Sequence, residues 1–134
     1  MNTSAIQRLS ARRVWDSRGN PTVEVEVQTA SGAIGRAIAP AGASRGTREA
    51  IDLRDGGTAL QGLDVRRAVA NVNTTIATAL KGMDCDDQAG IDAALVALDG
   101  TALKSALGGN AMVATSLAVL HAAAAVKAVP LWRH

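Results

Sequence analysis

The 134-residue sequence predicts an α+β fold, a three-stranded antiparallel meander followed by a small helical bundle. This prediction rests on a change in the spacing of apolar residues at Gly56-Gly57. Before this pair, apolar residues alternate with polar ones, as in a strand with one buried face. After it, apolar residues recur every three or four positions, as in an amphipathic helix. A single domain is expected over residues 1–134, because a chain of this length can bury one substantial core.

The central strand shows the alternation most clearly. Val23, Val25 and Val27 point to one side of the chain, and the residues between them point to the other. Gly19 and Pro21 in the preceding turn favour a hairpin with the first strand. Short turns join consecutive strands, so neighbouring strands should pair antiparallel. The expected strands are residues 5–15, 22–29 and 33–39.

Three helices are expected in the second half of the chain. Apolar residues form a single stripe along the first of them, and Lys81-Gly82 ends it. Asn110, after Gly108-Gly109, is the expected N-cap of the third. This third helix is apolar almost all round, which predicts that it is the most buried and that His121 is a core histidine. The expected helices are residues 62–80, 87–98 and 110–126.

Composition and charge favour a globular, cytoplasmic protein. Apolar residues make up 48% of the chain without any Phe or Tyr, which predicts a core of short aliphatic side chains. The 14 basic and 12 acidic residues are scattered, so no basic stripe for nucleic acid is expected. The apolar tract over residues 111–129 contains polar interruptions and is expected to be a buried helix instead of a membrane span. No secretory signal is expected at the N-terminus.

Cys85 is the only cysteine, which excludes an internal disulfide and a cysteine metal cluster. Acidic neighbours raise the pKa of a thiol, so Cys85 is expected to be a surface or half-buried residue without a catalytic role. Those neighbours, Asp84, Asp86 and Asp87, precede a predicted helix. The dipole of a helix favours acidic residues at its start, and we prefer this explanation of the cluster to a metal site. No nucleophile–base pair is visible, so no catalytic residue is predicted.

Residues 40–49 are the stretch least explained by packing. Its two glycines allow the backbone to approach a ligand closely and to move. Ser44 offers an oxygen, and Arg45 and Arg48 offer positive charge to an anion. The alternative is an ordinary loop leaving the third strand, because a glycine-rich loop without a following helix is not a phosphate-binding motif.

An ordered set of motifs runs along the chain. In sequence order they are Ala11–Pro21 (ARRVWDSRGNP), Pro40–Ser44 (PAGAS), Glu49–Gly56 (EAIDLRDG), Leu98–Thr101 (LDGT), Lys104-Ser105, Gly109–Ala111 (GNA), Ser116–Ala118 (SLA) and Val129–Leu131 (VPL). Together they resemble the amino-terminal domain of the enolases, the phosphopyruvate hydratases. The resemblance covers essentially the whole chain. In that family this domain is a three-stranded meander followed by helices, which is the architecture that the periodicities predict.

The resemblance implies the capping domain of a lyase that converts 2-phosphoglycerate to phosphoenolpyruvate in glycolysis, with Mg²⁺ as cofactor and a homodimer as the assembly. It implies that Ser44 is a ligand of the second Mg²⁺ and that Arg12 and Glu24 contact the partner subunit. The proton-transfer groups are expected in a carboxy-terminal barrel of roughly 250 residues. That barrel is absent from these 134 residues, so this chain alone is expected to be inactive. The implied lid loop over the substrate consists of Gly42, Ala43, Ser44 and Arg45.

Two loop positions depart from the family pattern. Arg45 stands where the family usually has Thr, and Ala41 stands where it usually has Ser. A long cation beside Ser44 either helps to hold an anionic substrate or repels Mg²⁺ and marks a paralogue acting on another phosphorylated or carboxylated acid. A different alternative is a free-standing, non-catalytic protein that kept the fold to bind a partner. In the chain alone, residues 41–48 are expected to be among the most mobile.

Overall fold

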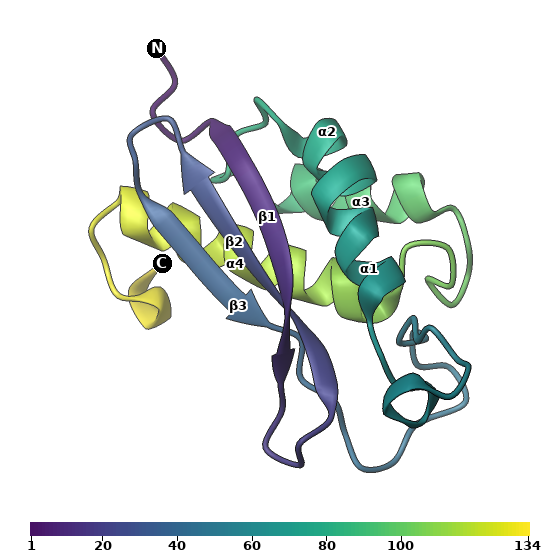
Figure 1. Cartoon of the computed structure of the whole chain (residues 1–134). Helices are drawn as coiled ribbons and strands as arrows, with labels where there is room; N and C mark the ends of the chain where they lie inside the picture. The colour runs from purple at the N-terminus through teal and green to yellow at the C-terminus, as the bar shows by residue number, and fades with distance from the viewer.

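The sheet of this chain is a three-stranded antiparallel meander in the order β1-β2-β3 (Figure 1). The computed structural model describes residues 1–134. The helices lie behind the sheet and beside it, so they cover only one of its faces. The predicted α+β fold is therefore confirmed. The strands are β1 (Ile6–Trp15), β2 (Pro21–Thr29) and β3 (Ile34–Ile38).

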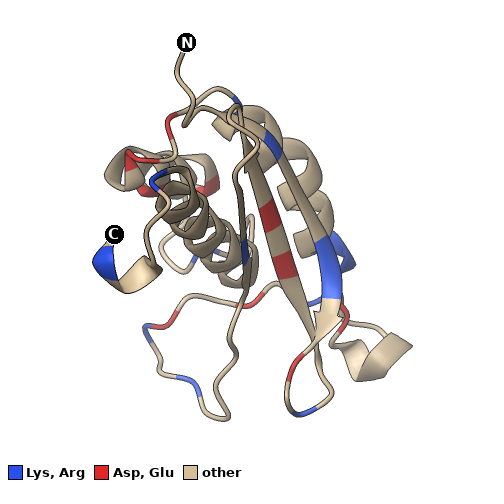
Figure 2. Cartoon of the chain, turned by 90° about the vertical axis from the view of Figure 1, so that its left-hand side faces the viewer, with Lys and Arg blue, Asp and Glu red and all other residues tan.

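The alternation along β2 places its valines in the core. Val23, Val25 and Val27 are fully buried. Val25 pairs with Ala11 of β1 and with Ala37 of β3, so small and aliphatic residues face the helices. The opposite face of the sheet carries charges, and Figure 2 shows acidic bands on one strand next to basic bands on another. This division of faces is the one that the period of two predicts.

The helical layer has two parts. One is a composite helix, made of α1, η2 and α2, that packs against β1. The other is a pair in which α4 lies under β2 and β3 and α3 packs against α4. The predicted second and third helices agree with α3 and α4 to within one residue at each end. The helices are α1 (Arg66–Asn71), α2 (Ala77–Leu80), α3 (Gln88–Asp99) and α4 (Gly109–Val126), with shorter turns η1 (Ala59–Gly62), η2 (Val72–Ile76) and η3 (Leu131–Arg133).

The first predicted helix, over residues 62–80, begins later than expected, at Arg66. Its first turn is capped from a distance, because the Asp55 carboxylate accepts the N–H groups of Arg66 at 2.9 Å and Arg67 at 3.0 Å. Gly62, with a φ of 77°, ends a separate short turn before the helix. The cap comes from eleven residues upstream of Arg66, so no local signal marks where the helix starts.

A π turn interrupts this composite helix at η2 and carries Asn73 beside the outer edge of β1. Asn73 Oδ1 accepts the N–H of Ala11 at 2.7 Å, and Asn73 Nδ2 donates to Ala11 O at 3.1 Å. The side-chain amide therefore pairs with Ala11 as a residue of a further strand would. Val72 and Ile76 at the two ends of the turn are both buried. The apolar stripe therefore continues across the π turn, and the sequence pattern could not distinguish this turn from regular α-helix.

α4 is the most buried helix, as predicted, with eleven of its 18 residues buried. It is not covered all round, because Val113 and His121, two turns apart, are exposed. The expectation of a core histidine is wrong, since the rest of the chain leaves this stripe of α4 uncovered. Asn110 is not the N-cap either: the helix begins at Gly109, and Gly108 is its N-cap.

By length and composition α4 could also cross a membrane, but this is weak evidence. In the fold, 61% of that apolar segment is buried inside the protein. The same apolarity is what a helix between a sheet and other helices requires.

β3 packs directly on the backbone of α4 at Gly35. A Cβ atom at Gly35 would overlap the main-chain oxygen of Ala118 and the main-chain nitrogen of Ala122. Gly35 is buried and faces the helices along with Ala37. The sheet and the helix therefore meet here with no side chain between them, and only glycine fits.

Cys85 is fully buried, contrary to the expectation of a surface or half-buried thiol. Its N–H donates to Ser4 O at 3.0 Å, and its neighbour Asp84 forms an isolated bridge with Ala5. This pairing holds residues 84–85 beside the start of β1 and buries the Cys85 side chain. The acidic neighbours of Cys85 along the chain give no indication of this burial. Burial, with the charges of Asp84 and Asp86 adding to it, raises the pKa of the Cys85 thiol. A thiol of this kind is a poor nucleophile.

Candidate functional site

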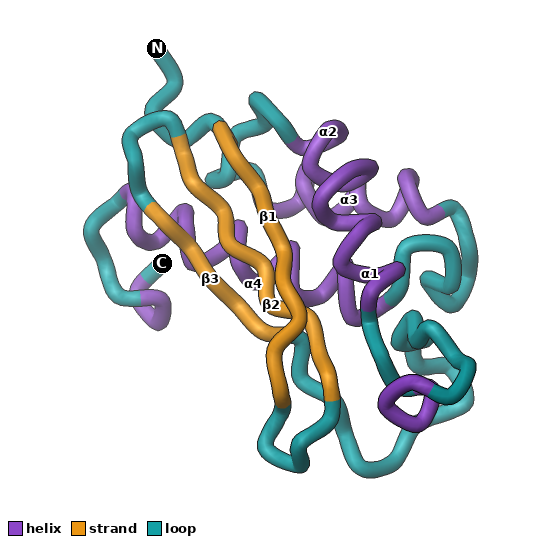
Figure 3. The backbone as a smooth tube through the Cα atoms, in the orientation of Figure 1, coloured by secondary structure: helices purple, strands orange, loops and turns teal.

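The loop that could carry chemistry lies in the stretch between β3 and α1, which Figure 3 shows as a long teal path below the sheet. Apart from the short turn η1, this stretch contains no helix or strand. It includes the lid residues implied by the resemblance, Gly42, Ala43, Ser44 and Arg45. Its freedom depends on where hydrogen bonds fix its two ends.

The start of the stretch is fixed to β2. Ala39 N donates to Val23 O at 2.9 Å, and Thr22 Oγ1 donates to Ala39 O at 2.8 Å. Both main-chain groups of Ala39 are therefore bonded, and Ala39 itself is buried. The chain leaves the sheet from a firmly held residue.

Arg18, in the turn between β1 and β2, fixes the next part of the stretch. Its Nη2 donates to Ala41 O at 2.9 Å and to Gly42 O at 3.1 Å. Arg18 was not among the predicted site residues. It is exposed and lies 23 residues before Ala41, so nothing local connects it with the loop.

Residues 42–49 are all exposed. The hydrogen bonds within this part are local: Gly46 N donates to Glu49 Oε2 at 3.0 Å, Glu49 N to Gly46 O at 3.3 Å, and Arg45 Nη2 to Glu49 O at 3.3 Å. Residues 43–50 make no hydrogen bond to the sheet or the helices. The expected mobility of residues 41–48 stays a prediction, and this arrangement supplies a physical reason for it from Ala43 onwards, whereas Arg18 holds Ala41 and Gly42.

The end of the loop is fixed to the helical layer. Ile51 N donates to Leu103 O at 2.8 Å, and Gly109 N donates to Ile51 O at 2.7 Å. Asn110 then bonds both main-chain groups of Leu53, with Oδ1 accepting at 3.0 Å and Nδ2 donating at 3.1 Å. Asn110 was predicted to cap a helix, but its side chain instead fixes the far end of the loop.

Arg54 connects this far end to the β1–β2 hairpin. Its Nη1 donates to Pro21 O and, at 2.8 Å, to Leu63 O, and its Nη2 lies 3.6 Å from Asp52 Oδ2. Burial raises the pKa of Asp52, and the charge of Arg54 offsets part of that rise. A hollow of about 200 Å³ separates these groups from the loop, with Ser44 on its lining. The hollow therefore holds charges of both signs beside Ser44.

The oxygens of Ser44 fit the metal that the resemblance implies. Hydroxyl and carbonyl oxygens are hard ligands, which suit Mg²⁺, and Mg²⁺ usually completes its shell with water and substrate phosphate oxygens. Gly42 leaves room for the Ser44 carbonyl, since a Cβ there would come within 3.1 Å of that oxygen. No three His, Cys, Asp or Glu side chains come together in the chain. Ser44 could thus contribute oxygen ligands to such a metal, beside the Glu49 and Asp52 carboxyl groups that line the same hollow.

Arg12 and Glu24, the implied dimer contacts, lie together on the open face of the sheet. Arg12 Nη2 lies 2.6 Å from Glu24 Oε1, and the side chain of Arg12 is 66% exposed. Arg36 and Glu26 form a second pair beside them at 2.5 Å. The structure therefore brings the two predicted residues into one ion pair within the chain.

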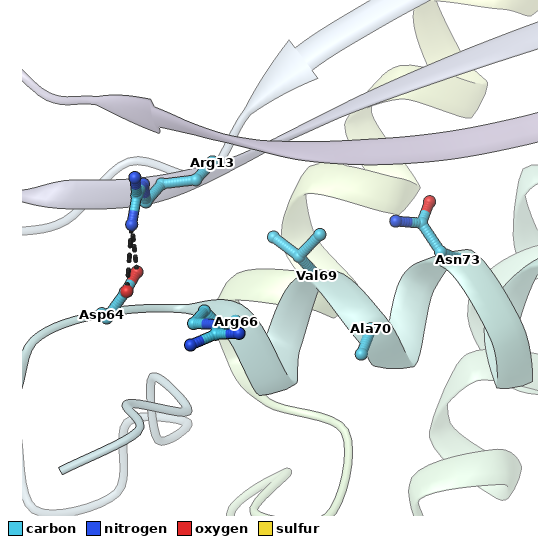
Figure 4. Close-up of a pocket in the computed structure, with 6 residues that line it drawn as sticks. All are labelled: Arg13, Asp64, Arg66, Val69, Ala70 and Asn73. Atoms are coloured by element: carbon cyan, nitrogen blue, oxygen red, sulfur yellow. Dashed lines mark hydrogen bonds and ion pairs between the residues drawn. The ribbon is translucent and has the colours of Figure 1, made fainter. Parts of the chain in front are cut away.

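A larger hollow, about 660 Å³, lies between β1 and α1 (Figure 4). Two sets of its polar groups already have partners: Arg13 Nη1 donates to both oxygens of Asp64, at 3.0 and 2.9 Å, and Asn73 is bonded to Ala11. The guanidinium of Arg66, the remaining charged group of the lining, forms no hydrogen bond. Burial would raise the pKa of Asp64, but the Val65 N–H and Arg13 together lower it. The bonds of Arg13 and Asn73 therefore connect β1 to the helical side of the hollow, and these groups are not available to a ligand.

Comparisons with known proteins agree with the resemblance. The family described as "Enolase, N-terminal domain" matches residues 6–134. Enolase 1 of Lactococcus lactis subsp. cremoris is 52% identical over 132 residues, which are 98% of this chain and 32% of that protein. An enolase of Streptococcus thermophilus is also 52% identical over 132 residues, 98% of this chain and 31% of that protein. The chain thus spans about a third of the length of these curated relatives.

Proposed function

The chain belongs to the enolase family, as its amino-terminal domain, and we propose that it caps the active site of a lyase that dehydrates 2-phosphoglycerate to phosphoenolpyruvate. In this proposal Gly42, Ala43, Ser44 and Arg45 form the lid. The observation that supports the lid is segment 43–50, which is exposed as far as Glu49 and has no hydrogen bond to the sheet or the helices between fixed residues on both sides. A segment held only at its ends can swing over a substrate while the sheet stays in place.

Within the lid, Ser44 is the residue that would hold Mg²⁺, through its hydroxyl and main-chain oxygens. The bound ion would stabilise negative charge that develops on the substrate during the reaction. Gly42 supports this role because it leaves the Ser44 carbonyl uncrowded. Arg45 donates to Glu49 O, which directs its charge along the loop. We infer that Arg45 contributes to attracting the anionic substrate.

We also infer that Arg12 and Glu24 contribute to a homodimer contact. They lie on the face of the sheet that no helix covers, and the largely exposed Arg12 side chain could reach a second subunit as well as Glu24. A role in glycolysis implies that the protein works in the cytoplasm.

A fusion protein tests the proposed activity. Residues 1–134 would replace the matching 132 residues of the Lactococcus lactis relative, and phosphoenolpyruvate formation would be followed by ultraviolet absorbance with excess Mg²⁺. Turnover by the fusion, and none by the 134-residue chain alone, is the expected result. A folded fusion that binds but does not convert 2-phosphoglycerate would favour a paralogue with another acid substrate. Turnover by the chain alone would refute the capping role.

The metal role of Ser44 has its own test in the same fusion. Ser44→Ala removes one oxygen ligand, so the Mg²⁺ concentration needed for half-maximal activity should rise about tenfold. Ser17→Ala is the matched control, since Ser17 is also an exposed serine, directly before the Arg18 that contacts the loop, and its side chain forms no hydrogen bond. An unchanged magnesium dependence in Ser44→Ala would show that Ser44 is not a ligand.

A further inference from the structure

We propose that Arg18 is a positioning residue that sets the hinge of the lid, an inference that rests on the proposed function. Its guanidinium crosses from the β1–β2 hairpin to the main-chain oxygens of Ala41 and Gly42, at 2.9 and 3.1 Å. These are the last hydrogen bonds that join the lid to the sheet before Ser44. Arg18 therefore determines where the freely moving part of the chain begins.

The turn that carries Arg18 is itself rigid. Asp16 Oδ1 accepts the N–H groups of Arg18 at 2.8 Å and Asn20 at 2.9 Å. The main chain closes the same turn, with Asp16 N donating to Asn20 O at 2.8 Å and Gly19 N to Asp16 O at 3.0 Å. Gly19 adopts a φ of 75°, which the turn requires. The Arg18 side chain thus extends from a fixed base, as a positioning group should.

Removing the Arg18 contact would lengthen the free segment. The next bonded residue towards the sheet is Ala39, whose N–H and carbonyl are both bonded to β2. Without Arg18 the segment without external hydrogen bonds would extend from residues 43–50 to residues 40–50. Each additional free residue must be ordered again when the lid closes, so closure would become less favourable.

The consequence for the proposed reaction concerns the capture of metal and substrate. Ser44 lies two residues beyond Gly42, so the bonds from Arg18 limit the positions that its oxygens can reach. A longer free segment spreads Ser44 over more positions, which weakens binding and leaves the groups that perform the chemistry unchanged. Loss of Arg18 should therefore raise the magnesium requirement and KM more than it lowers kcat.

The hinge can be tested in the 134-residue chain without any activity measurement. Backbone order parameters from ¹⁵N relaxation should be lower in Arg18→Ala than in the wild type at the two residues that Arg18 holds, Ala41 and Gly42, and at the adjoining Ala43, where they should fall below about 0.6. Arg18→Lys keeps a charged donor and should restore part of the order. Arg67→Ala is the matched control, because Arg67 is exposed and its guanidinium forms no hydrogen bond. Order parameters at residues 41–43 that are equal in wild type and Arg18→Ala would overturn the proposal.

The fusion protein then tests the functional part. In Arg18→Ala the Mg²⁺ concentration for half-maximal activity should rise about fivefold, the effect of losing charge-assisted hydrogen bonds. Arg18→Lys should recover much of it. If order falls but the magnesium dependence and KM stay unchanged, Arg18 does not position the lid. If the wild-type fusion has no activity, the proposed function fails, while the relaxation measurement still decides whether Arg18 sets the hinge.

Discussion

Gly35 and Gly46 lie close in sequence but in opposite surroundings. A Cβ at Gly35 would strike backbone atoms of Ala118 and Ala122 in α4, whereas a Cβ at Gly46 would meet no atom within 4 Å. Packing between sheet and helix requires the first glycine, and nothing in the static fold requires the second. The domain therefore has two different parts. One is a platform, the sheet and α4, in which the backbones of β3 and α4 touch directly. The other is the loop around Gly46, whose residues bond mainly to one another.

This difference gives the predicted mobility of the loop a physical basis. The platform is stiff because closely packed elements leave no room for rearrangement. The loop is free because its fixed points stand outside it, at Gly42 on one side and Ile51 on the other. Substitutions in the two regions should accordingly have very different effects on stability.

The largest effect is expected at the platform. Gly35→Ala should lower the free energy of unfolding by about 3 kcal/mol or more, because β3 and α4 must separate to admit one methyl group. Urea denaturation followed by circular dichroism measures this loss. A loss below about 1 kcal/mol would show that the contact between sheet and helix can relax.

A somewhat smaller effect is expected where the loop rejoins the platform. Asn110→Ala removes both bonds to the main chain of Leu53 and leaves buried polar groups without partners, so stability should fall by about 2 kcal/mol. Asn71→Ala is the comparison, since Asn71 bonds main-chain oxygens at a half-exposed site. Equal losses in the two variants would mean that Asn110 is not a special anchor.

A third prediction concerns pH and the loop after α3. Burial would raise the pKa of Asp99, but its bonds from the N–H of Leu107 and from Thr101 lower it below its usual value. A carboxyl group with a lowered folded pKa stabilises the fold above its unfolded pKa, and this contribution is lost as pH falls through the folded pKa. Asp99→Asn should therefore cost about 1 kcal/mol at pH 7, after allowance for solvent screening.

That cost should begin to shrink as the pH falls below about 4, the usual pKa of an aspartate in the unfolded chain, and should be lost once the pH has fallen through the lower pKa of Asp99 in the folded protein. Denaturation of both proteins at several pH values between about 2.5 and 7 gives the difference directly. A difference that stays constant over this range would mean that the charge of Asp99 is not what stabilises the loop.

The smallest effect is expected inside the loop, next to the proposed lid residues. Gly46→Ala should change the free energy of unfolding by less than about 0.5 kcal/mol, since the added methyl group meets no neighbour and the residue is exposed. Paired with Gly35→Ala, it is the same chemical change in the other region. A large loss at Gly46 would break the comparison, because it would mean that the loop has contacts beyond its own residues.

The sequence predicted those elements whose signal is repeated along the chain. The alternation of Val23, Val25 and Val27 predicted β2 and its buried face, and the apolar circumference of residues 110–126 predicted α4 as the most buried helix. Lys81-Gly82 correctly ended the composite helix, where Gly82 has a φ of 85°. A periodic pattern indicates which side of a strand or helix is buried, and this is what the patterns of β2 and α4 predicted correctly.

The sequence could not predict contacts made by single side chains across the fold. Asp55 caps a helix, Asn110 holds Leu53, and Arg18 holds Ala41, and each partner lies eleven or more residues away in the chain. The loop with Ser44 was singled out from its own residues and its metal role was implied by the resemblance, but the residues that hold the loop at its two ends were not predicted. The prediction that Cys85 is a surface or half-buried thiol was wrong for the same reason, since its burial depends on pairing with the N-terminal segment.

The bond between Asn73 and Ala11 has a consequence for association between chains. β1 is an edge strand, and an edge strand with free main-chain groups can recruit another strand and start aggregation. The Asn73 amide occupies the donor and the acceptor of Ala11 in the interior of that strand. An incoming strand would find those positions already taken and could not add a continuous ladder. One amide in a π turn thus protects the sheet from growing into a fibre along its β1 edge.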